Sequence, residues 1–361
     1  MSFQQISIKN FRAIESLEIK NIKQVNLLTG RNSCGKTSIL EAIFLLIGMS
    51  NPQLAINIHS FRKLILTDNK DFSYLFNGFD FSKVPTMSGK LISQKRMLAI
   101  KPHFSTSTGI VDQVPGRHEP AESKPISSTI TTKDIPNGLE FHFRLGDKLH
   151  HSEVKIIQID ESTHQVNIKH ASDYRENLRA SFINPESIMN SLHKRLEDIL
   201  IRKKSDEIVD SLREIEPNLR DIKLGTEGII YADITDIGKL VPINIMGDGI
   251  IKILAILVTI FEKENGILLI DEIENGLHYT ALVPLWKSIF KMIKECKVQL
   301  FIATHSYECI IAMTEVYRGL DVEEGFISLF RIDRDTDNQH YALQYESDTL
   351  LAGIEKEFEV R

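Results

Sequence analysis

A glycine-rich segment near the N-terminus carries the strongest chemical signal in the sequence. Residues 30–37 read Gly-Arg-Asn-Ser-Cys-Gly-Lys-Thr and satisfy the pattern G-x-x-x-x-G-K-[ST]. Such glycines let backbone N–H groups turn inward around phosphates, and the helix that follows adds partial positive charge. The lysine is expected to reach the β- and γ-phosphates, and the threonine hydroxyl to ligate Mg²⁺. The residues predicted to contact a nucleotide here are Gly30, Arg31, Asn32, Ser33, Cys34, Gly35, Lys36, Thr37 and Ser38.

A pair of carboxylates supplies a second candidate element. The apolar run at residues 267–270 is followed directly by Asp271 and Glu272. A strand of this kind would place both carboxylates at the C-terminal edge of a parallel sheet, where ligands bind. Asp271 would hold Mg²⁺ together with Thr37, and Glu272 would orient or deprotonate an attacking water.

A histidine ends the next apolar run along the chain. Residues 298–303 are followed by Thr304 and His305. At the tip of a core strand, His305 could contact a γ-phosphate or the attacking water, whereas the alternative is a merely structural hydrogen bond. We predict a catalytic group made of Lys36, Glu272 and His305.

Short alternating and apolar segments predict the elements that must position these side chains. Residues 6–8, 17–19 and 25–28 read as three strands, the last leading into the glycine-rich loop. Residues 38–47 have helical length and stop at Gly48. Strand, glycine loop and helix together form the context that a phosphate-binding loop requires.

The rest of the chain predicts further strands and helices. Helices at 249–261 and 281–294 alternate with the two apolar strands, which favours a parallel sheet covered on both faces. A final pair at 326–331 and 341–345 reads as a hairpin. Strands are also expected at 91–102, 139–143 and 154–159, around a loop rich in Ser, Thr, Pro and Gly at 105–138.

A helical insertion is predicted to begin at Asn184 and Pro185, a capping residue followed by proline. Its apolar pattern includes Ile188, Leu192, Leu196 and Ile199, and resumes at Ile208 and Leu212. Basic residues at 193–195 and 202–204 could form a track for nucleic-acid phosphates. The interleaved acids favour a solvated, salt-bridged helix instead.

These elements predict an α/β phosphate-loop fold with a mostly parallel core sheet, helices on both faces, an antiparallel side sheet and a short helical insertion. The whole chain, residues 1–361, is predicted to form a single head. Its expected parts are a phosphate-loop lobe at 1–90, a β-rich insertion at 91–175 with a flexible loop at 105–138, a helical insertion at 180–217 and a C-terminal lobe at 241–361.

Composition restricts the class of protein. The net charge of −6 over 361 residues argues against a generally basic nucleic-acid binder. Three scattered cysteines are too few for a disulfide framework. No apolar run approaches the roughly 18 residues that a membrane helix needs. We therefore expect a soluble, cytoplasmic protein that makes no membrane contact.

Four segments together resemble a known group of ATPases. They are Ile-Lys-Asn-Phe-Arg at 8–12, the phosphate loop, Ile-Asp-Glu-Ile-Glu-Asn-Gly-Leu-His at 270–278, and Thr-His-Ser at 304–306. This combination resembles the ABC-type ATPase heads of the RecF, SMC and OLD (overcoming lysogenization defect) group. It is most similar to the stand-alone bacterial AAA family ATPases of phage-defence operons. The resemblance covers about residues 1–50 and 240–310.

The resemblance implies a dimer in which two heads enclose ATP and Mg²⁺. Residues 246–252 stand where such ATPases place the signature motif, which approaches the nucleotide bound by the opposite subunit. Gly247, Asp248 and Gly249 would therefore contact nucleotide in trans. Met246 replaces a serine common in the group, which leaves the strength of ATP-driven closure open. The resemblance also places Arg12 near the nucleotide.

The function expected from the resemblance is Mg-dependent ATP hydrolysis that drives dimerisation, or assembly of a higher oligomer. Only 56 residues follow His305, too few for the nuclease domain of OLD enzymes. A separate effector, a nuclease or toxin, is therefore expected, with the chain acting as sensor or switch in anti-phage defence. The alternatives are a DNA-repair or recombination ATPase that clamps DNA, and an ATP-bound scaffold with negligible turnover. Nucleic acid stays a possible partner.

Overall fold

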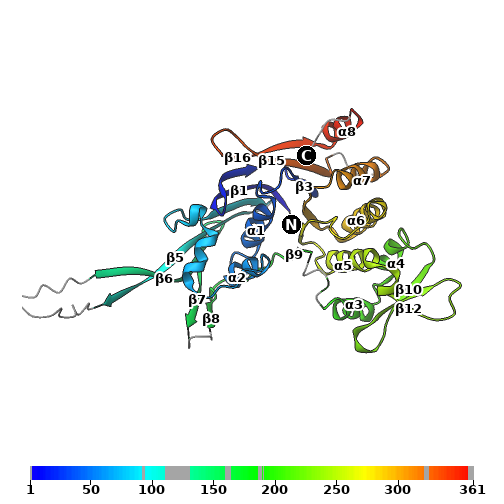
Figure 1. The fold of residues 1–361 in the computed structure, drawn as a ribbon, viewed down its shortest axis with the longest axis horizontal. Coiled ribbons are helices and arrows are strands. Elements are labelled where there is room, and N and C mark those ends of the chain that lie inside the picture. The colour runs from blue at the N-terminus through cyan, green and yellow to red at the C-terminus, as the bar shows by residue number, and fades with distance from the viewer. Residues whose placement is uncertain are drawn as a thin grey trace, which may run out of the picture.

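The computed structural model describes residues 2–91, 94–109, 131–158, 164–185, 189, 191–320 and 325–356. Two large β-sheets lie at the centre, and most helices pack on the outer side of one of them (Figure 1). Among the described residues, no helix combines the length and the apolar character needed to cross a membrane.

The mostly parallel sheet carries the predicted chemical motifs. Its strand order is β16-β15-β3-β14-β13-β9, and only β16 pairs antiparallel with its neighbour. The parallel core sheet and the C-terminal hairpin are confirmed, whereas β9 was not anticipated. The strands are β3 (Val25–Thr29), β9 (Ala180–Ile183), β13 (Ile267–Asp271), β14 (Gln299–Ala303), β15 (Ile327–Arg334) and β16 (His340–Glu346).

The second sheet is antiparallel and has seven strands in the order β2-β1-β4-β5-β6-β7-β8. Its first two strands come from the predicted phosphate-loop lobe, so the sheet crosses the expected boundary at residue 90. The prediction of a loop at 105–138 is wrong at both ends, because β5 and β6 pair along this stretch. Their antiparallel ladder begins with the pair Arg96 and Leu145 and ends with the pair Gly109 and Thr131. The middle of that loop lies outside the described residues. The strands are β1 (Phe3–Phe11), β2 (Ile14–Ile19), β4 (Thr86–Leu91), β5 (Lys95–Gly109), β6 (Thr131–Leu145), β7 (Lys148–Gln158) and β8 (His164–Lys169).

Alternation along the parallel strands divides the core into two layers. Leu269 and Phe301 are buried on the side of α1 (Lys36–Ile47) and the antiparallel sheet. Leu268 and Leu300 are buried on the opposite side, against a layer of helices visible on the right of Figure 1. Continuous apolar strands are required when both faces of a sheet are covered. The helices of that second layer are α5 (Asp248–Glu262), α6 (Leu282–Cys296) and α7 (Tyr307–Arg318).

The predicted helical insertion begins later than expected. Asn184 and Pro185 are not helical, because the chain is still leaving β9, which pairs with β13, and Asn184 is buried there. Ile188 lies outside the described residues. Two short helices follow, and a three-stranded sheet comes after them that sequence patterns did not predict. These elements are α3 (Leu192–Ile201), α4 (Asp206–Leu212), β10 (Leu219–Leu224), β11 (Ile230–Ile234) and β12 (Val241–Pro242).

The basic residues of this insertion are partly neutralised. Arg195 forms an ion pair with Glu262 of α5, with 2.8 Å between Nη2 and Oε2. Lys204 lies 3.6 Å from Glu207. These contacts favour the salt-bridged interpretation of the basic clusters.

The remaining helices are α2 (Gln53–Ser60) and α8 (Ser347–Glu355), with short 3-10 turns at Asn69–Leu75, Asn77–Phe79, Thr226–Gly228, Ile243–Met246 and Tyr279–Ala281.

Candidate active site

Three neighbouring parallel strands, β3, β14 and β13, end at one edge of the sheet. In the register, Leu28 faces Ala303, and Ala303 faces Asp271. The motifs that follow these strands therefore meet, although the glycine-rich loop is more than 200 residues before the other two in sequence. They line a cavity of about 550 Å³, which we call the strand-end cavity. Its lining residues are Ala13, Asn32, Ser33, Gly35, Lys36, Thr37, Ser38, Arg62, Asp271, Glu272, Ala303, Thr304 and His305.

The glycine-rich loop depends on backbone geometry that only glycine adopts easily. Gly30 has φ +130°, and a Cβ there would lie 2.3 Å from the carbonyl oxygen of Ile332. Gly35 has φ +100° and serves as the N-cap of α1 without a side-chain capping bond. The first N–H groups of a helix lack intrahelical acceptors. At α1 they are therefore available to an anionic ligand.

The Lys36 ammonium lies over the loop that precedes it. Its Nζ donates to the carbonyl oxygens of Gly30 at 2.8 Å and Arg31 at 3.0 Å. The Cys34 sulfur lies 3.9 Å from the same Nζ, and its side chain is buried. Arg31 is exposed and does not line the cavity. The loop carbonyls of Gly30 and Arg31 thus hold the Lys36 ammonium at the cavity.

Thr37 and Asp271 meet across the cavity. Both residues line the strand-end cavity, and the Thr37 hydroxyl lies close enough to the Asp271 carboxyl group to lower the pKa of that group in part. Burial raises the pKa of Asp271 to about 6, and the carboxylates of Glu272 and Glu41 act in the same direction. An acid whose charge is disfavoured by burial and by like charges gains most from a bound cation. The hydroxyl and carboxylate oxygens also match the donor set that Mg²⁺ prefers.

Glu272 is held at the cavity by its backbone. Its φ of +52° lies in the left-handed region, which is uncommon for a residue other than glycine. The Glu272 N–H donates to the carbonyl oxygen of Ala303 at 3.0 Å. Its Oε2 accepts a hydrogen bond from Asn275 at 3.1 Å. Strain of this kind is kept where the surrounding structure fixes the residue, often at functional sites.

His305 is oriented by a carboxylate that sequence reasoning did not assign to it. Its Nδ1 lies 3.5 Å from Glu274 Oε1, and its backbone N–H donates to the same oxygen at 3.2 Å. The His305 side chain is 52% exposed, whereas that of Glu274 is 12% exposed. Burial lowers the pKa of the nearby Lys252, against the opposing effect of Glu274 and Glu272. The His305 imidazole therefore lines the cavity, and its contact with Glu274 fixes its orientation.

A buried ion-pair layer supports the cavity from below. Glu41 of α1 is fully buried, and its Oε1 lies 2.7 Å from Arg62 Nε. Its Oε2 lies 2.7 Å from Arg12 Nε, in a pocket where burial lowers the pKa of Arg12 to about 10. Arg62 also donates to the Ser38 hydroxyl at 3.2 Å and lines the cavity. Arg12, predicted to approach the nucleotide, does not line the cavity.

Sequence reasoning missed Arg62 because it lies between 51 and 89, a segment without clear periodicity. It also missed two residues of the C-terminal hairpin. Arg334 donates to the Ser33 carbonyl oxygen at 3.2 Å and to His340 Nε2 at 3.2 Å. Burial lowers the pKa of His340, which packs against Gly35. The sequence pattern of the hairpin did not predict that its residues would contact the glycine-rich loop.

The predicted signature segment lies outside the cavity. Gly247 has φ +108°, and a Cβ there would meet no atom within 4 Å. Asp248 begins α5, whose N-terminus has no side-chain capping bond. Gly249 faces the side chain of Leu277. None of these residues lines the strand-end cavity of the same chain.

Comparison with known proteins gives one family match over most of the chain. The family described as "AAA domain, putative AbiEii toxin, Type IV TA system" matches residues 25–310. An ATP/GTP phosphatase of Helicobacter pylori is 24% identical over an alignment 351 residues long that covers 88% of this chain and 89% of that protein. The DNA replication and repair protein RecF of Nitrosococcus oceani is 50% identical over 46 residues, 13% of each chain.

Among solved structures, the fold is that of an SMC head. The SMC head bound to the C-winged helix domain of ScpA superposes with a TM-score of 0.50 at 11% sequence identity. The superposition covers 96% of this chain and 98% of that one. At this identity the likeness establishes the architecture, which is the expected α/β head with a mostly parallel core sheet and an antiparallel side sheet.

Proposed function

Because this chain belongs to the family described as "AAA domain, putative AbiEii toxin, Type IV TA system", we propose that it is a Mg-dependent ATPase that works as a nucleotide-sandwich dimer. The observation that carries the proposal is the strand-end cavity. It brings the glycine-rich loop with Thr37, the carboxylates of Asp271 and Glu272, and His305 together at one sheet edge.

Each group has a distinct part in the proposed reaction. Lys36, Arg62 and the free N–H groups of α1 bind the phosphates of ATP. Thr37 and Asp271 would hold Mg²⁺, which neutralises charge that develops on the phosphates. Glu272 orients the attacking water and accepts its proton. His305, held by Glu274, donates to the terminal phosphate or to the water.

The proposed dimer would complete each site with residues 247–249 of the other subunit. Two features support this arrangement. The N-terminus of α5 has uncapped N–H groups and an open approach at Gly247. The segment also does not line the cavity of its own chain, which supports a contact with the nucleotide of a second copy. ATP would then be the ligand that joins the two heads, and hydrolysis would separate them.

We further propose that this cycle switches a separate effector, a nuclease or toxin, in bacterial anti-phage defence. The family description, which names a toxin–antitoxin system, supports a partner polypeptide. A DNA-clamping repair ATPase is the second candidate, favoured by the short similarity to RecF. DNA that stimulates hydrolysis strongly at low salt and weakly at high salt would favour that candidate. A scaffold with negligible turnover is the third, and single-turnover assays separate it from a working ATPase.

The decisive experiment is light scattering on Glu272→Gln with and without Mg·ATP. The substitution should leave nucleotide bound while it stalls the attacking water, so the mass should double when ATP is added. When Lys36→Ala is added to Glu272→Gln, the mass should not change on addition of ATP. If Glu272→Gln binds ATP without any change of mass, the sandwich model is wrong, although the ATPase assignment can still be tested by phosphate release.

A further inference from the structure

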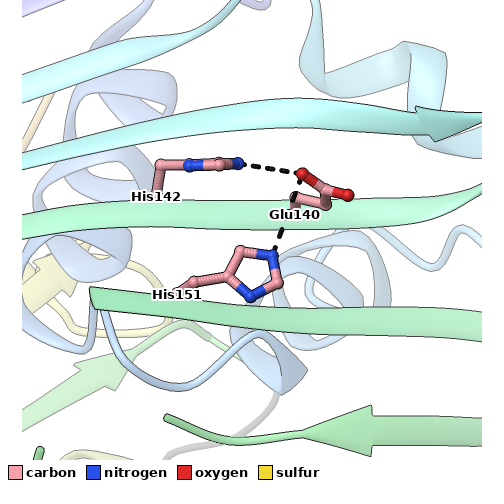
Figure 2. Close-up of side chains that lie close together, drawn as sticks. All are labelled: Glu140, His142 and His151. Carbon is pink, nitrogen blue, oxygen red and sulfur yellow. Dashed lines mark hydrogen bonds and ion pairs between the residues drawn. The ribbon is translucent and has the colours of Figure 1, made fainter. Parts of the chain in front are cut away.

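A cluster of histidines lies on the outer face of the antiparallel sheet, remote in sequence from every motif described above. Glu140 and His142 project from β6 and His151 from β7, and the alternate residues Phe141 and Phe143 are buried on the other face. His142 and His151 are directly opposite each other in the β6–β7 ladder. Figure 2 shows both imidazoles turned toward the Glu140 carboxylate.

Three imidazole nitrogens surround this one carboxylate. The Glu140 Oε2 atom lies 2.9 Å from His142 Nε2 and 3.8 Å from His151 Nε2. A third histidine, His103 of β5, places its Nε2 3.6 Å from Glu140 Oε1. Ligand atoms from Glu140, His142 and His151 all lie within 4.8 Å of one another. We call these four residues the histidine cluster.

The spacing suits a small ion with tetrahedral coordination. Zinc binds nitrogen at about 2.0–2.1 Å and oxygen at about 2.0–2.2 Å, so neighbouring ligands in a tetrahedron lie about 3.3 Å apart. The distances of His142 and His151 from Glu140 Oε2, 2.9 and 3.8 Å, fall on both sides of this value. These three residues are therefore already within reach of one ion, whereas His103, which lies 3.6 Å from the other oxygen, Oε1, has to move toward them to become the fourth ligand.

A neighbouring side chain orients His103 for this purpose. Its Nδ1 is hydrogen-bonded to Asn137 Oδ1. When Nδ1–H donates to this amide oxygen, Nε2 is the nitrogen left to bind a metal, and Nε2 is the atom that lies 3.6 Å from Glu140 Oε1. Bonds of this kind fix the tautomer of metal-binding histidines in many proteins.

The charges around the histidine cluster leave its carboxylate available. Glu153, opposite Glu140 on β7, is within 3.7 Å of Lys155 and 4.0 Å of Lys169. Lys101 of β5 is opposite Glu140 on the other side, and its side chain is exposed. Lys155 and Lys169 thus pair with Glu153, and the groups that approach the Glu140 carboxylate are the histidines.

We propose that His103, Glu140, His142 and His151 form a transition-metal site, of the kind that Zn²⁺ occupies, which cross-links strands β5, β6 and β7. Three imidazoles and one carboxylate fill a tetrahedral site, so the ion is structural and leaves no position for a substrate. Nitrogen ligands also distinguish it from the oxygen site proposed for Mg²⁺. This inference does not depend on the ATPase assignment.

The test is zinc titration of the full chain, without an affinity tag, after treatment with chelator and in the absence of nucleotide. Calorimetry should show one tight zinc ion per chain. His151→Ala should weaken binding at least about 100-fold, since loss of even an outer-shell partner costs roughly 10- to 100-fold. Glu140→Gln should weaken it similarly, with circular dichroism confirming that both variants fold.

His170→Ala is the matched control, because His170 is also exposed and lies just beyond β8. It should bind zinc as the wild type does. The proposal fails if wild type takes up less than one equivalent, or if His151→Ala and His170→Ala bind zinc equally well. Cobalt provides a second readout: the intense visible absorption of tetrahedral Co²⁺ supports the site, whereas the weak bands of octahedral Co²⁺ overturn it.

Discussion

The strand-end cavity and the histidine cluster are built by the two sheets in different ways. The cavity forms where parallel strands stop, so loops and a helix N-terminus supply most of its polar groups. The cluster forms on the face of an antiparallel sheet, where side chains from three paired strands stand next to one another. One region therefore offers oxygens and backbone N–H groups to phosphate and Mg²⁺, and the other offers imidazoles to a softer cation.

Burial differs between the two regions as well. Behind the cavity, Glu41 is fully buried between two arginines. In the histidine cluster, the Glu140 side chain is 26% exposed, and its partners are histidines rather than permanently charged arginines. The cavity thus depends on fixed charges held out of water, whereas the cluster depends on ligands that a metal can draw together. The predictions below test this contrast.

Removal of the proposed base should have the largest effect. We expect Glu272→Gln to lower kcat for ATP by about 10²–10⁴-fold, because general-base assistance contributes on that scale. Glu264→Gln is the matched control: it precedes the same strand β13 and is exposed, so turnover should not change. Phosphate release under saturating ATP measures both. Similar rates for Glu272→Gln and wild type would remove Glu272 from the chemistry.

The same substitution in both regions compares their buried charges. Glu41→Gln leaves Arg12 and Arg62 facing each other without the carboxylate, and we expect it to lower the free energy of unfolding by about 3–5 kcal/mol. Glu140→Gln in the metal-free protein should cost less than about 1 kcal/mol, since its surroundings are partly solvated. Urea unfolding of the two variants measures both costs. Equal losses would contradict the burial contrast.

Proton binding at Asp271 should control metal affinity in the cavity. With a folded pKa of about 6, raised first by burial, Asp271 is about nine-tenths protonated at pH 5 and ionised at pH 7. We therefore expect the affinity for Mg²⁺ with a non-hydrolysable ATP analogue to fall about tenfold from pH 7 to pH 5. Asp271→Asn should bind weakly at both values. A wild-type pH profile identical to that of Asp271→Asn would contradict the assignment.

The raised pKa of Asp271 also affects the free energy of unfolding. A rise in pH should strengthen Mg²⁺ binding but weaken the stability of the ligand-free protein. The unfolded carboxyl has its ordinary pKa of about 3.8 and the folded one about 6, so the folded state binds more protons between these values. Stability without ligand should therefore fall as pH rises from about 4 to 6. Asp271→Asn should remove this part of the pH dependence, as urea midpoints across that range would show.

The two regions also differ in how far the sequence predicts them. The phosphate loop and the acidic strand are contiguous motifs, so their residues could be named before the fold was known. Parallel pairing then brings Asp271 and His305 to the loop, as apolar strands covered on both faces require. The histidine cluster has no such motif, because His103 and His151 meet Glu140 only through strand register.

Arg62 and Arg334 show a second limit of sequence reasoning. Arg62 follows a short helix in a stretch without clear periodicity, and its partner Glu41 is an acid inside an apolar helix. Nothing local distinguishes that acid from a solvated one. Arg334 contacts Ser33, about 300 residues earlier, because β15 pairs beside β3. Long-range contacts of this kind require the strand order, which sequence periodicity does not give.

The signature segment gives the smallest predicted effect and concerns the proposed link between two cavities. Met246 precedes the open N-terminus of α5 and offers no hydroxyl. Met246 packs partly buried against the apolar core, and Met246→Ser would add one hydrogen-bond donor beside this N-terminus. A hydrogen bond from it to a phosphate would be worth about 0.5–1.5 kcal/mol. In the Glu272→Gln background, we expect ATP-dependent dimerisation to tighten by about 2- to 10-fold, measured by sedimentation. Ile245→Ser, which changes a neighbouring exposed residue, should have no such effect. If Met246→Ser and Ile245→Ser tighten dimerisation equally, the tighter dimer results from the loss of an apolar side chain and not from the hydroxyl. The backbone N–H groups of the α5 N-terminus would then be the contact with nucleotide in trans.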